Sequence, residues 1–146
     1  IYTDNMTREN FCDVLASMLE MEDKLPTNDI KKFSDTDNSN VSRLYHAKIV
    51  TGYEDGTFKP QSYITRQEAA VMLYRAAEYL GYKGNDISVG AMYSDDANIA
   101  DWAKAAVYQM NSIKVMSGVG ENKFDPESNY TNEQSIATVL RLYDAV

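Results

Sequence analysis

The sequence predicts an all-α protein built from repeated helix-loop-helix units. Three stretches begin with a polar cap, at Thr7, Thr65 and Thr131, and continue with apolar residues at helical spacing. No segment shows the alternation of apolar and polar residues that is typical of a half-buried strand. A glycine-containing loop with the same order of residues precedes two of these helices, so the chain is predicted to contain copies of one unit.

The clearest helix is predicted to begin after Thr65. Thr65 is a natural N-cap, and Glu68 can return a hydrogen bond to the Thr65 backbone, an arrangement worth on the order of 1 kcal/mol. Gly81 stands where a residue with left-handed backbone conformation is expected to end the helix. The predicted apolar face consists of Ala69, Met72, Leu73, Ala76 and Leu80.

The loop before this helix, residues 52–60 (GYEDGTFKP), is predicted to be a tight turn. Gly52 and Gly56 can adopt positive φ at little steric cost. The same order of residues returns later in the chain at one constant offset, in the pairs Gly52/Gly118, Phe58/Phe124, Pro60/Pro126 and Thr65/Thr131. Four matches at one offset indicate an internal duplication of the loop and its helix.

Further helices are predicted at 41–48, at 99–113 and from Thr131 to about Ala145. Asp35 or Ser39 is expected to cap the first of them. The residues expected to be buried are Trp102, Ala106, Met110 and Ile113 in the second, and Ile136, Val139, Leu140 and Tyr143 in the third.

Composition bounds the class of protein. A chain of 146 residues with 44% hydrophobic and 25% charged residues is ordinary for one soluble globular domain. The formal charge of −8 argues against binding to nucleic acid phosphates, and no apolar run is long enough to predict a transmembrane helix. The single cysteine, Cys12, lies on an apolar helical stripe and is expected to be a buried hydrophobe. The chain starts without Met in the middle of a motif, so we expect it to be a fragment of a longer protein.

No catalytic or metal-binding pattern is present in the sequence. The only histidine, His46, has no nucleophile near it in sequence and is expected to be structural. Acidic pairs occur, but none lies in the alternating loop that a calcium site of the EF-hand type needs. The sequence therefore predicts a protein without a metal or other cofactor and without enzymatic activity.

The chain resembles the S-layer homology family in a long composite motif, which reads F-x-D, a helix, G-Y-x-D-G-T-F-x-P and I-T-R-x-E. Residues 33–35 and 64–68 match closely, and a copy starting at 93–95 matches with substitutions. The resemblance implies one domain of three repeats around a pseudo-threefold axis, with grooves between neighbouring repeats. The expected divisions are 1–32 for a partial repeat one plus linker, 33–92 for repeat two plus linker, and 93–146 for repeat three.

Arg8 and Arg66 both follow the threonine that caps their helix. A cation at a helix N-terminus is unfavourable by a few tenths of a kcal/mol, so this placement suggests a function. The resemblance implies that these arginines bind the carboxylate of an anionic secondary cell-wall polysaccharide, such as a pyruvylated glycan. Alternatively, each arginine pairs with an acidic residue of an adjacent repeat.

The rest of the groove also follows from the resemblance. Hydrogen bonds to the sugar are expected from Thr7 and Thr65 at their helix N-termini, and the groove wall is expected to contain Gly52, Tyr53, Asp35, Asp95 and Trp102. Core packing remains the alternative role for Trp102. In the third copy Asn132 replaces the arginine, so binding there is expected to be weak or absent.

The resemblance implies a non-catalytic module that anchors a larger exported protein to the bacterial cell wall or S-layer. The alternative is a module for protein-protein interaction or S-layer self-assembly that uses the same grooves. An enzyme acting on glycans is disfavoured, because no acidic pair recurs with the motif. Repeat one lacks its first half, which would leave an apolar helix face bare, and a homodimer that exchanges helices could cover it.

Overall fold

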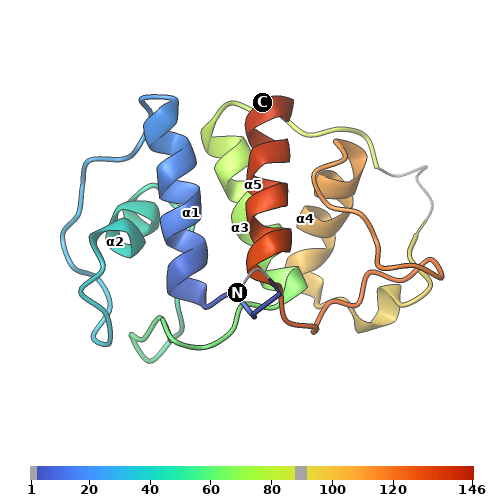
Figure 1. Cartoon of the computed structure of the whole chain (residues 1–146), viewed down its shortest axis with the longest axis horizontal. Helices are drawn as coiled ribbons and strands as arrows, with labels where there is room; N and C mark the ends of the chain where they lie inside the picture. Colours follow the sequence, from blue (N-terminus) through green and yellow to red (C-terminus); the bar gives the residue numbers. More distant parts are fainter. Residues whose placement is uncertain (1–2, 88–91) are drawn as a thin grey trace.

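The computed structural model describes residues 3–87 and 92–146, which form a bundle of α-helices joined by loops (Figure 1). The elements are α1 (Arg8–Met21), α2 (Ser39–His46), α3 (Arg66–Tyr79), the 3-10 helix η1 (Asp96–Asn98), α4 (Asp101–Ser112) and α5 (Asn132–Ala145). Within the described residues, β pairing is limited to isolated bridges. The predicted all-α class is confirmed.

The three long helices α1, α3 and α5 begin directly after the predicted threonines. The Thr7 hydroxyl oxygen accepts a hydrogen bond from the backbone N–H of Asn10, at 3.1 Å. Thr65 and Thr131 each have a complete capping box, in which the threonine N–H donates to the side chain of Glu68 or Gln134 at 3.0 Å. Local capping therefore fixes where these helices start.

The cap of α2 differs from the prediction. The Asn38 side chain caps this helix by accepting a hydrogen bond from the Asn40 N–H at 2.8 Å, and the helix begins at Ser39. Asp35 is not available as a cap, because its carboxylate accepts hydrogen bonds from the backbone N–H groups of residues 58–59.

Three extended segments preceding α1, α3 and α5 are joined in a closed ring of backbone hydrogen bonds. The Met6 N–H donates to Tyr130 O at 2.7 Å, the Tyr130 N–H donates to Ile64 O at 2.9 Å, and the Ile64 N–H donates to Met6 O at 2.9 Å. All three side chains are buried. The ring holds the N-terminal ends of the three long helices close together, at the lower edge in Figure 1.

The helices pack around one apolar core. Helix α1 packs against α2 and α5, and α3 packs against α4 and α5. The largest fully buried side chains are Phe11, Leu15, Leu19, Phe33, Leu44, Ile49, Phe58, Ile64, Leu73, Met110, Phe124 and Tyr130. Cys12 is also completely buried, and this burial raises the pKa of its thiol, so the predicted buried hydrophobe is confirmed.

Two predicted apolar faces are wrong in part. Trp102 is 62% exposed, and the buried face of α4 consists of Ala103, Ala106, Val107, Gln109 and Met110. On α5, Ile136 and Leu140 are 39% and 53% exposed, whereas Val139 and Leu142 are buried. The reason is tertiary: α1 and α3 each carry another helix, α2 or α4, while the main contacts of α5 are with α1 and α3.

Among the helices that the structure describes, none combines the length and the apolar character needed to cross a bilayer.

Candidate functional site

Two open cavities lie where the start of one long helix meets a glycine-containing loop and the side of the next long helix. The first is lined by Arg8, Val50, Thr51, Gly52, Tyr53, Glu68, Val71, Met72, Arg75 and Trp102. The second is lined by Arg66, Met116, Ser117, Gly118, Val119, Tyr130, Glu133, Gln134, Ala137, Thr138 and Arg141. We call them the Arg8 cavity and the Arg66 cavity.

The two cavities are built from residues in equivalent positions of the sequence. The two arginines each follow a capping threonine, and the remaining pairs share one offset along the chain: Val50/Met116, Thr51/Ser117, Gly52/Gly118, Tyr53/Val119, Glu68/Gln134, Val71/Ala137, Met72/Thr138 and Arg75/Arg141. The Arg66 cavity is the larger, about 410 Å³ against about 230 Å³. Several of these positions carry a smaller side chain in the Arg66 cavity, such as Val119 in place of Tyr53, which agrees with its larger volume.

Arg8 lies at the base of its cavity and is only 6% exposed. Its Nε donates to Phe58 O at 2.9 Å, and its Nη1 donates to Glu68 Oε2 at 2.8 Å. The guanidinium carbon lies 4.6 Å from the ring centroid of Phe58 and 5.1 Å from that of Tyr53. The Tyr53 hydroxyl also donates to Glu68 Oε2, at 3.4 Å. Arg8 therefore already pairs with an acid of the neighbouring helix, as the alternative interpretation of the sequence expected.

Arg66 occupies the equivalent place and is 5% exposed, but its partners differ. Its Nε donates to Phe124 O at 2.8 Å and its Nη2 donates to Ser117 O at 2.7 Å. No carboxylate of the described residues forms an ion pair with it. Burial lowers the pKa of Arg66, an effect that the neighbouring Tyr130 partly opposes. This guanidinium is thus sheltered from water, donates hydrogen bonds to two carbonyl groups, and lies 4.7 Å from the ring centroid of Phe124 and 5.5 Å from that of Tyr130.

The replacement of Glu68 by Gln134 at the equivalent position explains why Arg8 has a carboxylate partner and Arg66 does not. The Glu68 carboxylate has two oxygens, of which Oε1 accepts from the Thr65 N–H and Oε2 accepts from Arg8. Gln134 has a single side-chain oxygen, and it accepts from the Thr131 N–H. The other terminal group of Gln134 is an NH₂, which can only donate and cannot pair with a guanidinium.

Asp35 and Asp95 hold the loops rather than line the cavities. The Asp35 carboxylate accepts from the N–H groups of Phe58 and Lys59, both at 2.9 Å. Asp95 makes the same two bonds to residues 124–125, at 2.9 and 2.8 Å. Desolvation raises the pKa of both carboxyl groups, but these backbone hydrogen bonds more than offset it, so the net shift is downward.

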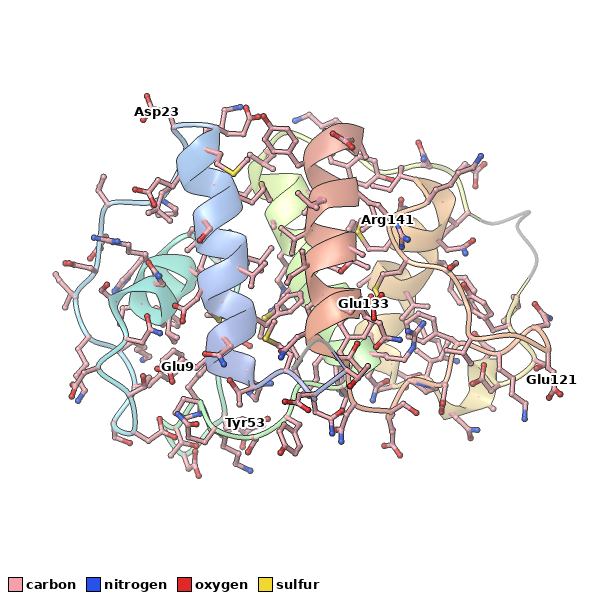
Figure 2. All side chains as sticks on the ribbon, in the orientation of Figure 1. Glu9, Asp23, Tyr53, Glu121, Glu133 and Arg141 are labelled. Atoms are coloured by element: carbon pink, nitrogen blue, oxygen red, sulfur yellow. The ribbon has the colours of Figure 1, made fainter. Side chains whose placement is uncertain are left out.

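Gly52 brings its loop close to the core beneath the Arg8 cavity. Its φ is +72°, and a Cβ placed there would lie 2.2 Å from Cε1 of Phe33. Tyr53 follows at once and is partly exposed beside the cavity, at the lower edge of the molecule in Figure 2. A glycine is therefore required at this position, and it sets where the Tyr53 ring stands.

Apart from Asp35 and Asp95, the predicted site residues fall into three groups. Arg8, Gly52, Tyr53 and Trp102 meet at one cavity, and Arg66 lines the other. The hydroxyl groups of Thr7 and Thr65 are occupied in helix caps, and neither residue lines either of the two cavities. Asn132 also lies outside both cavities, and its backbone N–H donates to Asp4 O at 2.9 Å.

Sequence reasoning missed a second arginine in each cavity. Arg75 and Arg141 line the Arg8 and Arg66 cavities respectively. Figure 2 shows Glu133 and Arg141 on the same side of α5. The repeat pattern could have revealed them, because Arg75 follows Thr65 at the same distance in the sequence as Arg141 follows Thr131.

A family model described as the S-layer homology domain matches residues 26–70 and 93–131, together more than half of the chain. The chain belongs to the S-layer homology family. The matched segments contain the two loops, the caps of α3 and α5, and Arg66. The family that the F-x-D, glycine-loop and capping motifs predicted is thus confirmed.

Several relatives carry a similar S-layer homology region. An amylopullulanase of Thermoanaerobacterium thermosulfurigenes is 29% identical over 143 residues, covering 95% of this chain and 8% of that protein. The exoglucanase XynX of Acetivibrio thermocellus is 28% identical over 146 residues, covering 95% of this chain and 13% of that protein. A cellulosome-anchoring protein of the same species is 25% identical over 144 residues, covering 94% of this chain and 32% of that protein. The chain thus spans less than a third of each of these relatives.

The chemistry of the two cavities suits binding. Each cavity combines a buried arginine at a helix N-terminus with a second arginine and with backbone groups of a loop, which together can hold an anion. Within residues 3–87 and 92–146, no group of three or more His, Cys, Asp or Glu side chains could hold a metal ion. The family model that matches these segments describes an S-layer homology domain.

Proposed function

We propose that this chain is a non-catalytic cell-surface anchoring module that binds anionic secondary cell-wall polysaccharide in its two cavities. The observation that carries the proposal is the duplicated cavity, with an arginine at the base and another arginine on the next long helix. A guanidinium fork can bind a carboxylate through two charge-assisted hydrogen bonds, each contributing about 1.5–3 kcal/mol when sheltered.

Membership of the family supports a role at the bacterial surface. Two of the relatives are named cell surface glycoprotein 1 and cellulosome-anchoring protein, and others are named as enzymes that act on polysaccharides. If this region is a surface anchor, it can be joined to many different proteins, which explains why relatives with such different names share it. Weak individual sites gain avidity when several grooves engage one polymer.

The same proposal includes the threefold architecture. The ring formed by Met6, Ile64 and Tyr130 relates the three capped helices in a cyclic way, which supports three repeats divided at 1–32, 33–92 and 93–146. In this division the Arg66 cavity lies between repeats two and three, and the Arg8 cavity lies between repeats one and two, with Trp102 added from repeat three. The third copy, in which Asn132 replaces the arginine, is proposed to bind anionic glycan weakly or not at all.

One observation favours the alternative role in protein-protein interaction or self-assembly. Ile136 and Leu140 stand one turn apart on α5 and are both exposed, which forms an apolar strip suited to a partner helix. A homodimer that covers this strip is the simplest form of the alternative. A monomeric mass in light scattering at high protein concentration would exclude it.

A pull-down with purified cell-wall sacculi tests the anchoring function. The chain is incubated with sacculi before and after hydrofluoric acid has stripped the attached polysaccharide. We expect the chain to sediment with intact sacculi and to remain in solution with stripped ones. Equal binding to both preparations would contradict recognition of the polysaccharide, and no binding to either would contradict anchoring.

A further inference from the structure

Helix α5 differs from the other two long helices in what covers its outer face. Among the described helices, the main partners of α5 are α1 and α3, whereas α1 also carries α2 and α3 also carries α4. We propose that the exposed face of α5 is the docking site of a further amphipathic helix of the same polypeptide, which packs on α5 as α4 packs on α3. The inference rests on the threefold arrangement proposed above and does not depend on the ligand of the cavities.

Equivalent positions on the three long helices show which side chains the further helix would cover. Each helix has 14 residues and follows a capping threonine, so the positions can be compared one by one. Ile136 is 39% exposed, whereas Cys12 and Ala70 at the equivalent positions are completely buried. Leu140 is 53% exposed, whereas its equivalents on α1 and α3 are buried and partly buried. Helix α5 therefore exposes two large apolar side chains where the other long helices are covered.

The second residue after each capping threonine fastens the start of the neighbouring short helix. Gln67 Oε1 accepts from the N–H of Ala100, the N-cap residue of α4, at 2.9 Å. Glu9 Oε1 accepts from the hydroxyl of Thr36, just before α2, at 3.2 Å. Glu133 holds the equivalent position on α5, where it is exposed and accepts no hydrogen bond within residues 3–87 and 92–146. An acceptor therefore stands where the start of a docked helix is expected.

The charge of Glu133 complements the N-terminus of a helix. The first backbone N–H groups of a helix have no partner within it, and this end carries the positive end of the helix dipole. A carboxylate binds such N–H groups more strongly than the neutral amide of Gln67 does. The occupant that fits is thus a helix that begins beside Glu133 and turns apolar residues at helical spacing toward Ile136 and Leu140.

A helix in this place would also close one side of the Arg66 cavity. Trp102 of α4 contributes to the lining of the Arg8 cavity. The lining of the Arg66 cavity comes from Arg66, from residues 116–119 and 130 before α5, and from α5 itself, including Glu133. This cavity is also the larger, about 410 Å³ against about 230 Å³. The docked helix would supply the wall that α4 supplies to the Arg8 cavity.

The size of the exposed strip favours a helix of the same polypeptide over a second copy of the chain. A stable interface between separate proteins buries roughly 1,200–2,000 Å². Even a large aromatic side chain buries only about 150–250 Å², so two aliphatic side chains provide a small part of that area. A tethered helix needs less, because a short linker gives it an effective concentration in the millimolar range.

The α4 segment of this chain provides a probe for the docking site. A copy of residues 93–127 is placed before Asp4, in place of residues 1–3, just as the original segment precedes Ser128. We expect the added helix to pack on α5. In methyl-labelled protein, the signals of Ile136 and Leu140 should then shift and show nuclear Overhauser contacts with the added segment. Unchanged methyl signals beside a helical extension would overturn the inference.

A second version covers the case in which the added segment does not fold. Ile136→Ala gives α5 the alanine that α3 has at Ala70, where the original α4 segment packs on a long helix. The added segment should then become helical and contact Leu140. A segment that stays unfolded in this version as well would overturn the inference.

A charged substitution tests whether the strip becomes buried. Leu140→Lys is expected to change the midpoint of thermal unfolding of the original chain by less than ~2 °C, because the position is exposed. In the extended protein it should lower the midpoint by ~5 °C or more, because the lysine would be buried without a partner. Met21→Lys is the matched control on α1, 65% exposed, and should have the same small effect in both proteins. Equal effects of Leu140→Lys in the two proteins would contradict docking.

Two measurements on the original chain separate this inference from its rivals and from the proposed function. A dimeric mass in light scattering that becomes monomeric in Leu140→Lys would assign the strip to a second copy and overturn the inference. Sedimentation with sacculi uses the original chain, so the anchoring function stands or fails independently of the docked helix.

Discussion

Gly52 shows at the scale of a single residue how the loop sequence builds the Arg8 cavity. Its backbone adopts a φ of +72° and passes so close to Phe33 that a side chain would overlap the ring. Gly56, in the same loop, has a φ of +84°, but no neighbouring atom lies within 4 Å of the point that a Cβ would occupy there. The two glycines therefore separate the cost of backbone conformation from the cost of a steric clash.

Replacing each glycine with alanine should give different losses of stability. Gly56→Ala is expected to cost about 1–2 kcal/mol, because only the left-handed conformation is penalised. Gly52→Ala should cost a further ~1–3 kcal/mol for the clash with Phe33. Urea denaturation measures both. Equal losses in the two variants would show that Phe33 does not restrict this position.

At the scale of elements, two aspartates fasten the loops that shape the cavities. The net downward pKa shifts of Asp35 and Asp95 mean that their ionised forms are favoured in the folded chain. A group with a lowered folded-state pKa contributes stability above its unfolded value, here 3.8, and loses it as the pH falls through the folded-state pKa.

Acid should therefore weaken the fold partly through these two carboxyl groups. The free energy of unfolding is expected to fall as the pH is lowered below about 4, and the double variant Asp35→Asn, Asp95→Asn should show a shallower fall over the same window. Denaturant titrations from about pH 6 to about pH 2 measure this. An unchanged pH dependence in the double variant would mean that other carboxyl groups dominate.

The sequence predicted the elements well because helix caps and glycine turns act over a few residues. Thr65 and Glu68 sit three positions apart, so their capping box could be read directly. The exposure of Trp102 on α4 and of Leu140 on α5 could not be predicted in this way, because it depends on which other helix covers that face of each helix. The pairing of Arg8 with Glu68 joins residues far apart in the chain, and the repeat pattern left open whether it would form.

At the scale of the whole molecule, the ring of backbone hydrogen bonds connects parts of the chain that are distant in sequence. Met6 lies near the start of the chain and Tyr130 near its end, yet their backbones are bonded at 2.7 Å. The ring is buried and links the starts of all three long helices. Breaking one of its bonds should therefore require the bundle to open as a whole.

Hydrogen exchange can test this cooperativity. The amides of Met6, Ile64 and Tyr130 are expected to exchange with similar free energies of opening, close to the free energy of global unfolding. Native-state exchange followed by nuclear magnetic resonance, with small additions of denaturant, gives these values. Much faster exchange at Met6 than at Ile64 would show that the N-terminal segment opens separately and would argue against a cyclic threefold unit.

The most direct measurement of the central claim is calorimetric titration of purified secondary cell-wall polysaccharide into the original chain and two variants. Arg66→Ala should weaken binding by about tenfold or more, because it removes a buried guanidinium that forms no ion pair within the part of the chain that the structure describes. Asn132→Ala should bind like the original chain, since this residue lines neither cavity. Comparable losses of affinity in the two variants would contradict the account.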